Sequence, residues 1–158
     1  MYFARFGHGC ATTSYRGSAH VFVVGGKESG YLGLDSMEVF SINEERWIND
    51  FYLKRLPEPL YFLQVVEAHS PDFLVYTVGG YDSGYNSPVS TMYGLTNNKR
   101  WVEIGDLKTR RSQHATISVE SNDFQGCQSK LLTKQVKIII NTVHKVIINV
   151  LTFKYYST

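Results

Sequence analysis

Two segments of this 158-residue chain are copies of each other, and this duplication limits the possible folds more than any other feature. Residues 25–47 and 79–101 align without a gap. Nine of their 23 positions are identical, including a Gly-Gly doublet at the start and a Trp at the end. A period near 50 residues indicates one supersecondary unit repeated along the chain, as in a solenoid or a propeller.

An apolar run leads into each copy, HVFVVGG at 20–26 and FLVYTVGG at 73–80. A β-branched and aromatic run that ends in Gly-Gly predicts a strand entering a tight turn. Glycine adopts positive φ without steric cost, and its missing Cβ lets a neighbouring segment approach closely. A Trp can fill the space between adjacent sheets. We therefore expect structural roles for six residues: Gly25, Gly26, Gly79, Gly80, Trp47 and Trp101.

The order of these features resembles the kelch repeat, the four-stranded unit that forms one blade of a β-propeller. Its pattern is an apolar run, a Gly doublet, a central strand with an aromatic or aliphatic residue, and a Trp towards the end of the unit. The second copy matches at Gly79, Gly80, Tyr93 and Trp101, and the first copy has Val39 where Tyr is more typical.

The kelch unit also opens with a strand similar to Arg-x-x-His. This pattern is present at Arg5–His8 and at Arg111–His114, and the middle unit has Pro59–Phe62 in its place. The resemblance covers about residues 3–120. It implies an all-β fold, a kelch-type β-propeller fragment of about two four-stranded blades plus the opening strand of a third.

The predicted domain is residues 3–120, with blade 1 at about 5–50, blade 2 at about 55–105 and the start of blade 3 at about 110–120. The expected strands are 8–14, 20–25, 36–42 and 46–49, then 60–67, 73–78, 90–95 and 100–104, and finally 114–120. Propellers close with about four to eight blades, so two blades cannot form a ring. We therefore expect a fragment of a longer protein or a truncated product.

Residues 121–158 form a tail outside the repeat pattern. From Ser129 to Thr158, half of the positions hold Lys, Ile, Asn, Phe or Tyr, the types encoded by AT-rich codons. The segment has no Gly, Pro, Trp or acidic residue. Two interpretations stay open for this tail: non-coding sequence read in frame, or a disordered extension.

The net charge of +2 hides a split between the repeats and the tail. Residues 1–123 hold 11 basic and 14 acidic side chains, a net charge of −3, whereas residues 124–158 hold five lysines and no acid. A nucleic-acid-binding surface needs clustered basic residues in the folded part, so no nucleic-acid partner is expected. The sequence shows no signal peptide, no Asn-x-Ser/Thr sequon and no apolar run long enough to span a membrane. We therefore expect a cytoplasmic protein without a membrane partner.

The sequence contains no recognisable catalytic, cofactor-binding or metal-binding pattern. Its five histidines lack metal-ligand spacing, and no His-Glu-x-x-His, Cys-x-x-Cys or Gly-x-Ser-x-Gly element occurs. We therefore expect no enzyme activity, no cofactor and no small-molecule ligand.

Two types of loop are the candidate binding elements. The resemblance implies that the loop between the second and third strands and the loop after the fourth strand share one face, where kelch propellers receive protein partners. Each repeat offers there an acid, a tyrosine and nearby basic residues, and Tyr and Arg are enriched at interface hot spots. The candidate partner-binding residues are Glu28, Tyr31, Arg55, Asp82, Tyr85, Arg110 and Arg111. An alternative role for the acids and tyrosines is to hold their own loops.

The resemblance implies a protein-binding module. The parent would be a substrate-recognition subunit of a cullin-type ubiquitin ligase, which carries a BTB domain upstream, or an actin-binding or cytoskeletal scaffold. Two alternatives stay open: a fragment of a propeller enzyme similar to galactose oxidase, and a truncated product with no function of its own.

Overall fold

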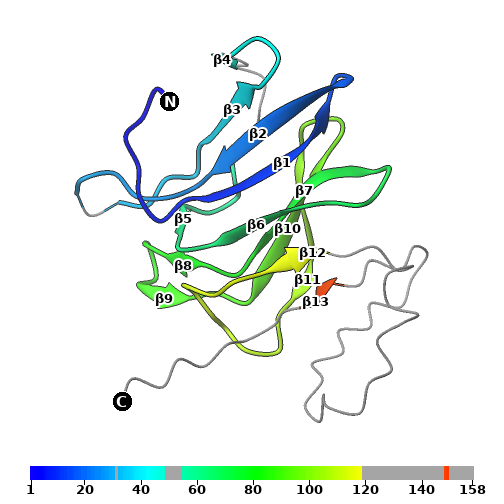
Figure 1. Cartoon of the computed structure of the whole chain (residues 1–158). Coiled ribbons are helices and arrows are strands. Elements are labelled where there is room, and N and C mark those ends of the chain that lie inside the picture. Colours follow the sequence, from blue (N-terminus) through cyan, green and yellow to red (C-terminus); the bar gives the residue numbers. More distant parts are fainter. Residues whose placement is uncertain (31, 49–54, 119–147, 150–158) are drawn as a thin grey trace, which may run out of the picture.

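Residues 1–30, 32–48, 55–118 and 148–149 are described by a computed structural model (Figure 1). All regular secondary structure in these residues is β-strand, which confirms the all-β prediction. The structure contains two four-stranded antiparallel sheets with the same up-and-down strand order, a three-stranded sheet and a strand pair. Within the described residues, no helix is long and apolar enough to cross a membrane.

The first sheet is formed by β1 (Gly9–Tyr15), β2 (Ser18–Val24), β3 (Met37–Ser41) and β4 (Arg46–Ile48), paired in that order. The second sheet repeats this arrangement with β6 (Gln64–Glu67), β7 (Phe73–Val78), β10 (Thr91–Thr96) and β11 (Trp101–Asp106). The small sheet joins β5 (Leu60–Tyr61), β8 (Tyr81–Asp82) and β9 (Ser87–Pro88).

Most observed strands agree with the predicted ones to within two residues at their ends, and three larger differences occur. The expected strand 60–67 is split into β5 and β6 because Phe62, between them, has a positive φ of 54°. The hairpin of β8 and β9 within the second Gly-Gly loop was not predicted. The expected strand 114–120 is observed only as β12 (Ile117–Ser118). β12 pairs with β13 (Ile148–Asn149), a segment of the tail, and the other residues after 118 lie outside the described part.

The strand register shows that the ungapped alignment of the two copies is wrong by one position across the third strand. Val24 pairs with Met37. The ungapped alignment makes Val78 the counterpart of Val24 and Thr91 that of Met37, but Val78 pairs with Met92. The second copy therefore has one more residue in the loop after the doublet and one fewer in the following turn. As a result Tyr93 corresponds to Glu38, and not to Val39 as the sequence suggested.

The opening segments of successive repeats are hydrogen-bonded to each other. The Phe62 amide donates to the Gly7 carbonyl at 2.6 Å, and the Gln113 amide donates to the Phe62 carbonyl at 3.0 Å. Gly7, Phe62 and Gln113 have positive φ values of 63°, 54° and 54°. They therefore occupy equivalent positions in three repeats. This equivalence corrects the sequence prediction, because the middle counterpart of Arg5–His8 and Arg111–His114 is residues 60–63 and not 59–62.

The main hydrophobic core lies between the two large sheets. Its buried side chains come from both sheets and from the segments that join them: Tyr15, Phe22, Val24, Val39, Leu56, Leu60, Leu63, Val65, Leu74, Val75, Tyr93 and Leu95. A second cluster covers the opposite face of the second sheet and consists of Val66, Ala68, Tyr76, Val78, Met92 and Leu107. The first strands of the repeats lie side by side, β1 beside β6 and β6 beside β12.

The Gly-Gly doublets make this close packing possible. All four glycines have φ between 56° and 124°, a region that other L-residues rarely adopt. A Cβ on Gly79 would lie 2.6 Å from the Arg111 carbonyl oxygen, and a Cβ on Gly80 would lie 2.9 Å from Leu63 Cβ. The first glycine therefore touches the next repeat, and the second touches the opening strand of its own repeat.

Candidate protein-binding surface

The antiparallel pairing places both types of predicted loop at one end of the sheets. Gly9 at the start of β1 lies opposite Val24 at the end of β2, and Val24 lies opposite Met37 at the start of β3. β4 runs back toward the same end. We call this the loop end, formed by residues 25–36, 55–63, 79–90 and 107–113, excluding the undescribed residue 31.

The loops of the first sheet are linked directly to the segment that leads into the second. The Leu56 amide donates to the Asp35 carbonyl at 2.8 Å. The Arg55 guanidinium forms an ion pair with the Asp35 carboxylate at 2.9 Å. The Arg55 side chain is 74% exposed, so this ion pair adds little stability but sets the position of a cationic group at the loop end.

An aromatic cluster lies at the loop end, formed by Phe6, Tyr61, Phe62 and Tyr81. The ring centroids of Tyr61 and Tyr81 are 5.2 Å apart, those of Tyr61 and Phe62 are 5.0 Å apart, and those of Phe6 and Phe62 are 6.4 Å apart. The Lys27 Nζ lies 4.9 Å from the centroid of the Tyr61 ring, within cation–π range. Phe6 is 51% exposed and the other three residues are half-buried.

This cluster is held by the small sheet and by the opening segments. β5 carries Tyr61 and pairs with β8, which carries Tyr81, so the two rings lie opposite each other on adjacent strands. In the first repeat, the backbone of Phe6 forms an isolated β-bridge with that of Lys27. This bridge takes the place of the pairing between β5 and β8 in the second repeat. The Tyr81 hydroxyl donates to the Asn86 carbonyl at 2.8 Å, which ties the ring to the hairpin loop.

Asp82 holds its own loop and is not available to a partner. Its side chain is buried, and Oδ1 accepts hydrogen bonds from the Gly84 amide at 2.6 Å and the Tyr85 amide at 3.3 Å. Tyr85, at the tip of this loop, is 85% exposed. Asp82 thus takes the loop-holding role that the sequence left as an alternative, and it presents Tyr85 to solvent.

The other predicted residues differ in their surroundings. Glu28 and Arg110 are exposed on separate loops. Arg111 is half-buried, its Nε donates to the Thr109 carbonyl at 3.3 Å, and its own carbonyl accepts from the Gly80 amide at 2.9 Å. Tyr31 lies outside the described residues. The structure therefore brings the described candidates to one end of the sheets but distributes them over several loops: Glu28, Arg55, Asp82, Tyr85, Arg110 and Arg111.

Sequence reasoning missed the aromatic cluster. The sequence predicts a continuous strand over 60–67, in which the side chains of Tyr61 and Phe62 would point to opposite faces. The positive φ of Phe62 breaks that strand and brings both rings to the loop end. The one signal in the sequence was the adjacent pair of aromatic residues close to Pro57 and Pro59, which disfavour a regular central strand.

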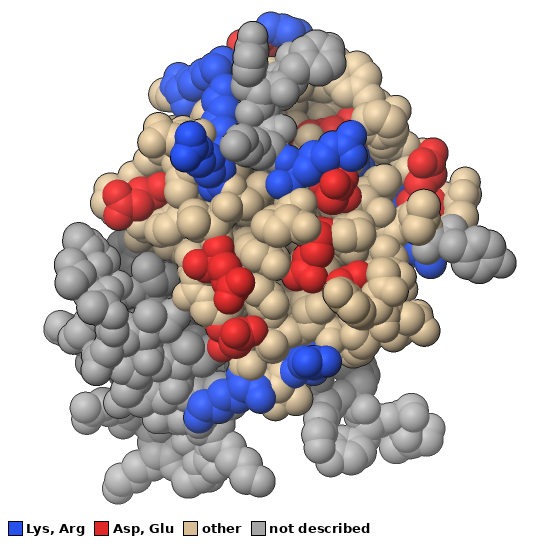
Figure 2. Space-filling view, turned by 180° about the vertical axis from the view of Figure 1, so that it is seen from behind, with Lys and Arg blue, Asp and Glu red and all other residues tan. Residues whose placement is uncertain are grey.

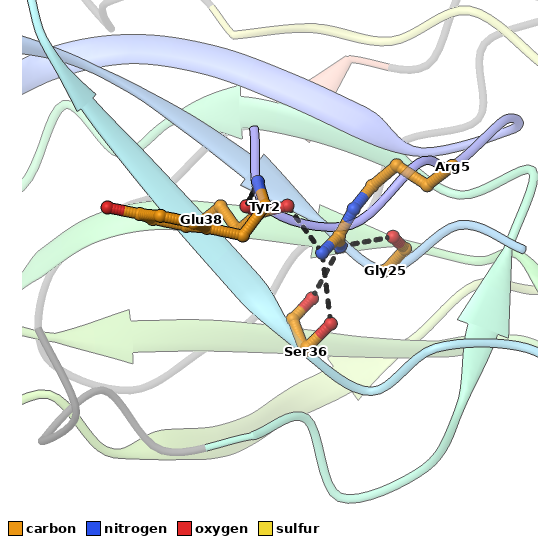
Figure 3. A network of polar contacts seen from close by, with 5 residues as sticks. All are labelled: Tyr2, Arg5, Gly25, Ser36 and Glu38. Carbon is orange, nitrogen blue, oxygen red and sulfur yellow. Dashed lines mark hydrogen bonds and ion pairs between the residues drawn. The ribbon is translucent and has the colours of Figure 1, made fainter. Parts of the chain in front are cut away.

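A buried ion pair supports the loop end of the first sheet (Figure 3). The Arg5 guanidinium bonds the Glu38 carboxylate at 2.7 Å, and it also donates to the Gly25 carbonyl at 2.8 Å and to the Ser36 carbonyl and hydroxyl, each at 3.1 Å. The Tyr2 amide donates to the same carboxylate. Burial lowers the pKa of Arg5, and Glu38 opposes that shift.

The second sheet replaces this ion pair with other residues. Leu60 corresponds to Arg5, and Tyr93 corresponds to Glu38. The Tyr93 hydroxyl donates to Glu58 Oε1 at 2.7 Å. Burial is the main cause that raises the pKa of Tyr93 and also that of Glu58. Both sets of residues therefore link the third strand of a sheet to a segment outside that sheet, Glu38 to Arg5 and Tyr93 to Glu58.

Charges of both signs are interspersed on the face shown in Figure 2, without a large patch of one sign. The described residues contain no group of three or more His, Cys, Asp or Glu side chains that could hold a metal ion. The loop end itself combines partly exposed aromatic side chains with charges of both signs, among them Lys27, Glu28 and Arg55; aromatic residues and arginine are the types enriched at protein interfaces.

No model of a known protein family matches the chain, and no curated protein matches it as a relative.

Proposed function

We propose that this chain is a kelch-type β-propeller fragment that binds a protein partner through its loop end. Three features support the propeller assignment: the identical strand order of the two sheets, their packing face to face, and the side-by-side first strands β1, β6 and β12. In a propeller the first strands of all blades surround a common axis.

The observation that carries the binding proposal is the aromatic cluster at the loop end. Tyrosine supplies a large contact area and a hydroxyl at low entropic cost, which is why it is enriched at binding hot spots. Tyr61, Phe62 and Tyr81 already pack on one another, so little order has to be gained on binding. Tyr85 and Leu32, which are 85% and 76% exposed, extend the apolar surface over two loops.

The class of partner follows from the two parent types that the kelch resemblance implies. One is a substrate protein captured by a cullin-type ubiquitin ligase, and the other is actin or another cytoskeletal protein. The loop end carries both acidic residues, such as Glu28 and Asp35, and basic ones, such as Arg55, which fits a protein surface with both signs of charge rather than a polyanion.

The test compares proteins retained from a cell extract by the wild-type chain and by two variants. Tyr61→Ala with Tyr85→Ala removes two loop-end rings, whereas Val102→Ala removes an exposed apolar side chain from β11. We expect specific partners to be lost with the first variant and kept with the second. Cosedimentation with purified filamentous actin tests the cytoskeletal class directly. Partners that bind all three proteins equally would contradict the proposal.

A further inference from the structure

One ammonium group of the chain already lies over the aromatic cluster. The Lys27 Nζ is 4.9 Å from the centroid of the Tyr61 ring, a distance at which the electron-rich face of an aromatic ring attracts a cation. Among the described residues, Lys27 forms no ion pair with a carboxylate. The ring of Tyr61, and not an acidic side chain, therefore receives this charge.

Lys27 occupies a position at which the next repeat has an aromatic residue. It follows the first Gly-Gly doublet as Tyr81 follows the second. The backbone of Lys27 is bridged to that of Phe6, just as Tyr81 is paired with Tyr61. Two hydrogen bonds hold this bridge, from the Lys27 amide to the Phe6 carbonyl at 2.8 Å and from the Phe6 amide to the Lys27 carbonyl at 2.9 Å. The Tyr61 ring thus has an aromatic neighbour from its own repeat and a cation from the preceding repeat.

The contact between Lys27 and Tyr61 is weak enough to be exchanged. Both residues are only half-buried, and the lysine stem is flexible. A cation–π contact at an exposed site shifts an equilibrium by only about two- to fivefold. The same contact becomes stronger when water is excluded from the ring. A cation that arrives with a protein surface can therefore replace the Lys27 ammonium.

Carboxyl groups near the pair of tyrosines favour a cation at this place. Asp82 follows Tyr81 on β8, and its side chain is buried. Burial is the main cause that raises the pKa of Glu58, and the charge of Asp82 raises it further, so the two carboxyl groups lie close to each other. Glu28, next to Lys27 in the chain, is exposed. Acidic groups around a binding site attract cations toward it.

We propose that the Tyr61 ring receives a lysine or arginine side chain of the protein partner, and that Lys27 occupies this place in the free chain. It depends on the binding function proposed above, because the partner supplies the side chain. Lys27 is then an internal competitor that the partner displaces. Removing its charge strengthens the binding of another cation, whereas a purely structural role of Lys27 would weaken that binding or leave it unchanged.

The experiment measures the binding of choline to the full chain through the nuclear magnetic resonance signals of the Tyr61 ring. Choline carries a quaternary ammonium, a cation that aromatic rings recognise, and its tert-butyl analogue has the same shape without the charge. Lys27→Met keeps an apolar side chain and removes the charge. Lys108→Met removes an exposed charge from another loop of the loop end and is the matched control.

We expect choline to shift the Tyr61 signals, with a Kd lowered about two- to fivefold by Lys27→Met and unchanged by Lys108→Met. The neutral analogue should bind more weakly and show no such gain. Lys27→Gln replaces Lys27→Met if circular dichroism shows that the latter is unfolded. The proposal is overturned by equal binding of choline and its analogue, by an equal gain in Lys108→Met, or by a Kd that Lys27→Met raises or leaves unchanged.

Retention of partners from a cell extract separates this cation site from the binding function itself. We expect Lys27→Met to retain partners more strongly than the wild-type chain. If the choline result is negative while Tyr61→Ala with Tyr85→Ala still loses its partners, the loop end binds proteins without a cation site at Tyr61. If choline binds as expected while partners ignore the loss of both rings, the binding function is rejected and the ring remains a cation site.

Discussion

The first and second sheets have the same strand order but pack against different elements. The difference shows how the position of a repeat along the chain changes which side chains it buries and which contacts they make. Among the described residues, the second sheet contributes to a buried hydrophobic cluster on each face, whereas the first sheet contributes to one such cluster. The first sheet has a buried ion pair at its loop end, and the second sheet has Leu60 and Tyr93 there. Two sheets with the same strand order thus have different side chains at equivalent positions where the elements packed against them differ.

The largest expected effect comes from breaking the ion pair. Glu38→Ala leaves the Arg5 guanidinium buried without its carboxylate, so we expect a loss of about 3–5 kcal/mol in the free energy of unfolding. Tyr93→Phe removes only a neutral donor at the equivalent position and should cost about 1 kcal/mol. Urea denaturation measures both. Equal costs would show that the two positions do not differ as the contacts indicate.

A double variant sharpens this comparison. Arg5→Leu with Glu38→Tyr transfers the residue pair of the second sheet to the first. Since replacing a buried ion pair with packed apolar groups is often neutral, we expect the double variant to be more stable than Glu38→Ala alone. A double variant as unstable as the single one would mean that the ion pair is required by the particular packing of the first sheet.

The tryptophans give the next largest difference. Trp101→Ala opens a cavity at the edge of the core between the sheets, and we expect a cost of about 3 kcal/mol. Trp47→Ala removes an edge-on contact with Phe40 on the side of the first sheet that faces away from the second, and should cost about 1–2 kcal/mol. Thermal unfolding of both variants tests this order. A larger cost at Trp47 than at Trp101 would contradict this difference in packing.

His114 should make stability depend on pH. Burial, and then the nearby Arg111, lower the pKa of His114 below its ordinary value of 6.5, and neither ring nitrogen has a hydrogen-bond partner in the described part of the chain. The unfolded chain therefore binds the proton more tightly, so this stability is present above pH 6.5 and lost as the pH falls toward the lowered value. His114→Leu, which copies Leu63 at the equivalent position, should reduce the slope between neutral pH and pH 5 in denaturation curves.

The smallest expected effect is at Glu58, and it has the opposite sign. Burial is the main cause that raises its pKa above the ordinary value of 4.5, so the folded state binds the proton more tightly. This contribution is full below pH 4.5 and is lost as the pH rises through the raised value. Glu58→Gln can still accept the Tyr93 hydrogen bond, and it should flatten this part of the stability curve. A stability that falls in Glu58→Gln at neutral pH would contradict this account.

The duplication in the sequence predicted the strands closely because its signals are local. The run before each doublet predicted β2 and β7, and β7 has the predicted bounds of 73–78. The pairing register of the third strand could not be predicted from such local signals. An extra residue in one loop and a missing residue in the next turn cancel over the whole repeat, so Trp47 and Trp101 align although the strand between them is shifted. The candidate site was predicted only as a set of loops.

By itself, the sequence determined the repeat, the positions of most strands and the places where the backbone turns, because alternating hydrophobicity and glycine conformation act within a few residues. The tertiary structure decided what those residues do. It buried Asp82 and left Tyr85 exposed, brought Tyr61 and Phe62 into one cluster with Phe6, and gave equivalent tryptophans different neighbours. These outcomes depend on contacts between segments far apart in the chain, and a side chain is buried or exposed according to which sheet lies against it.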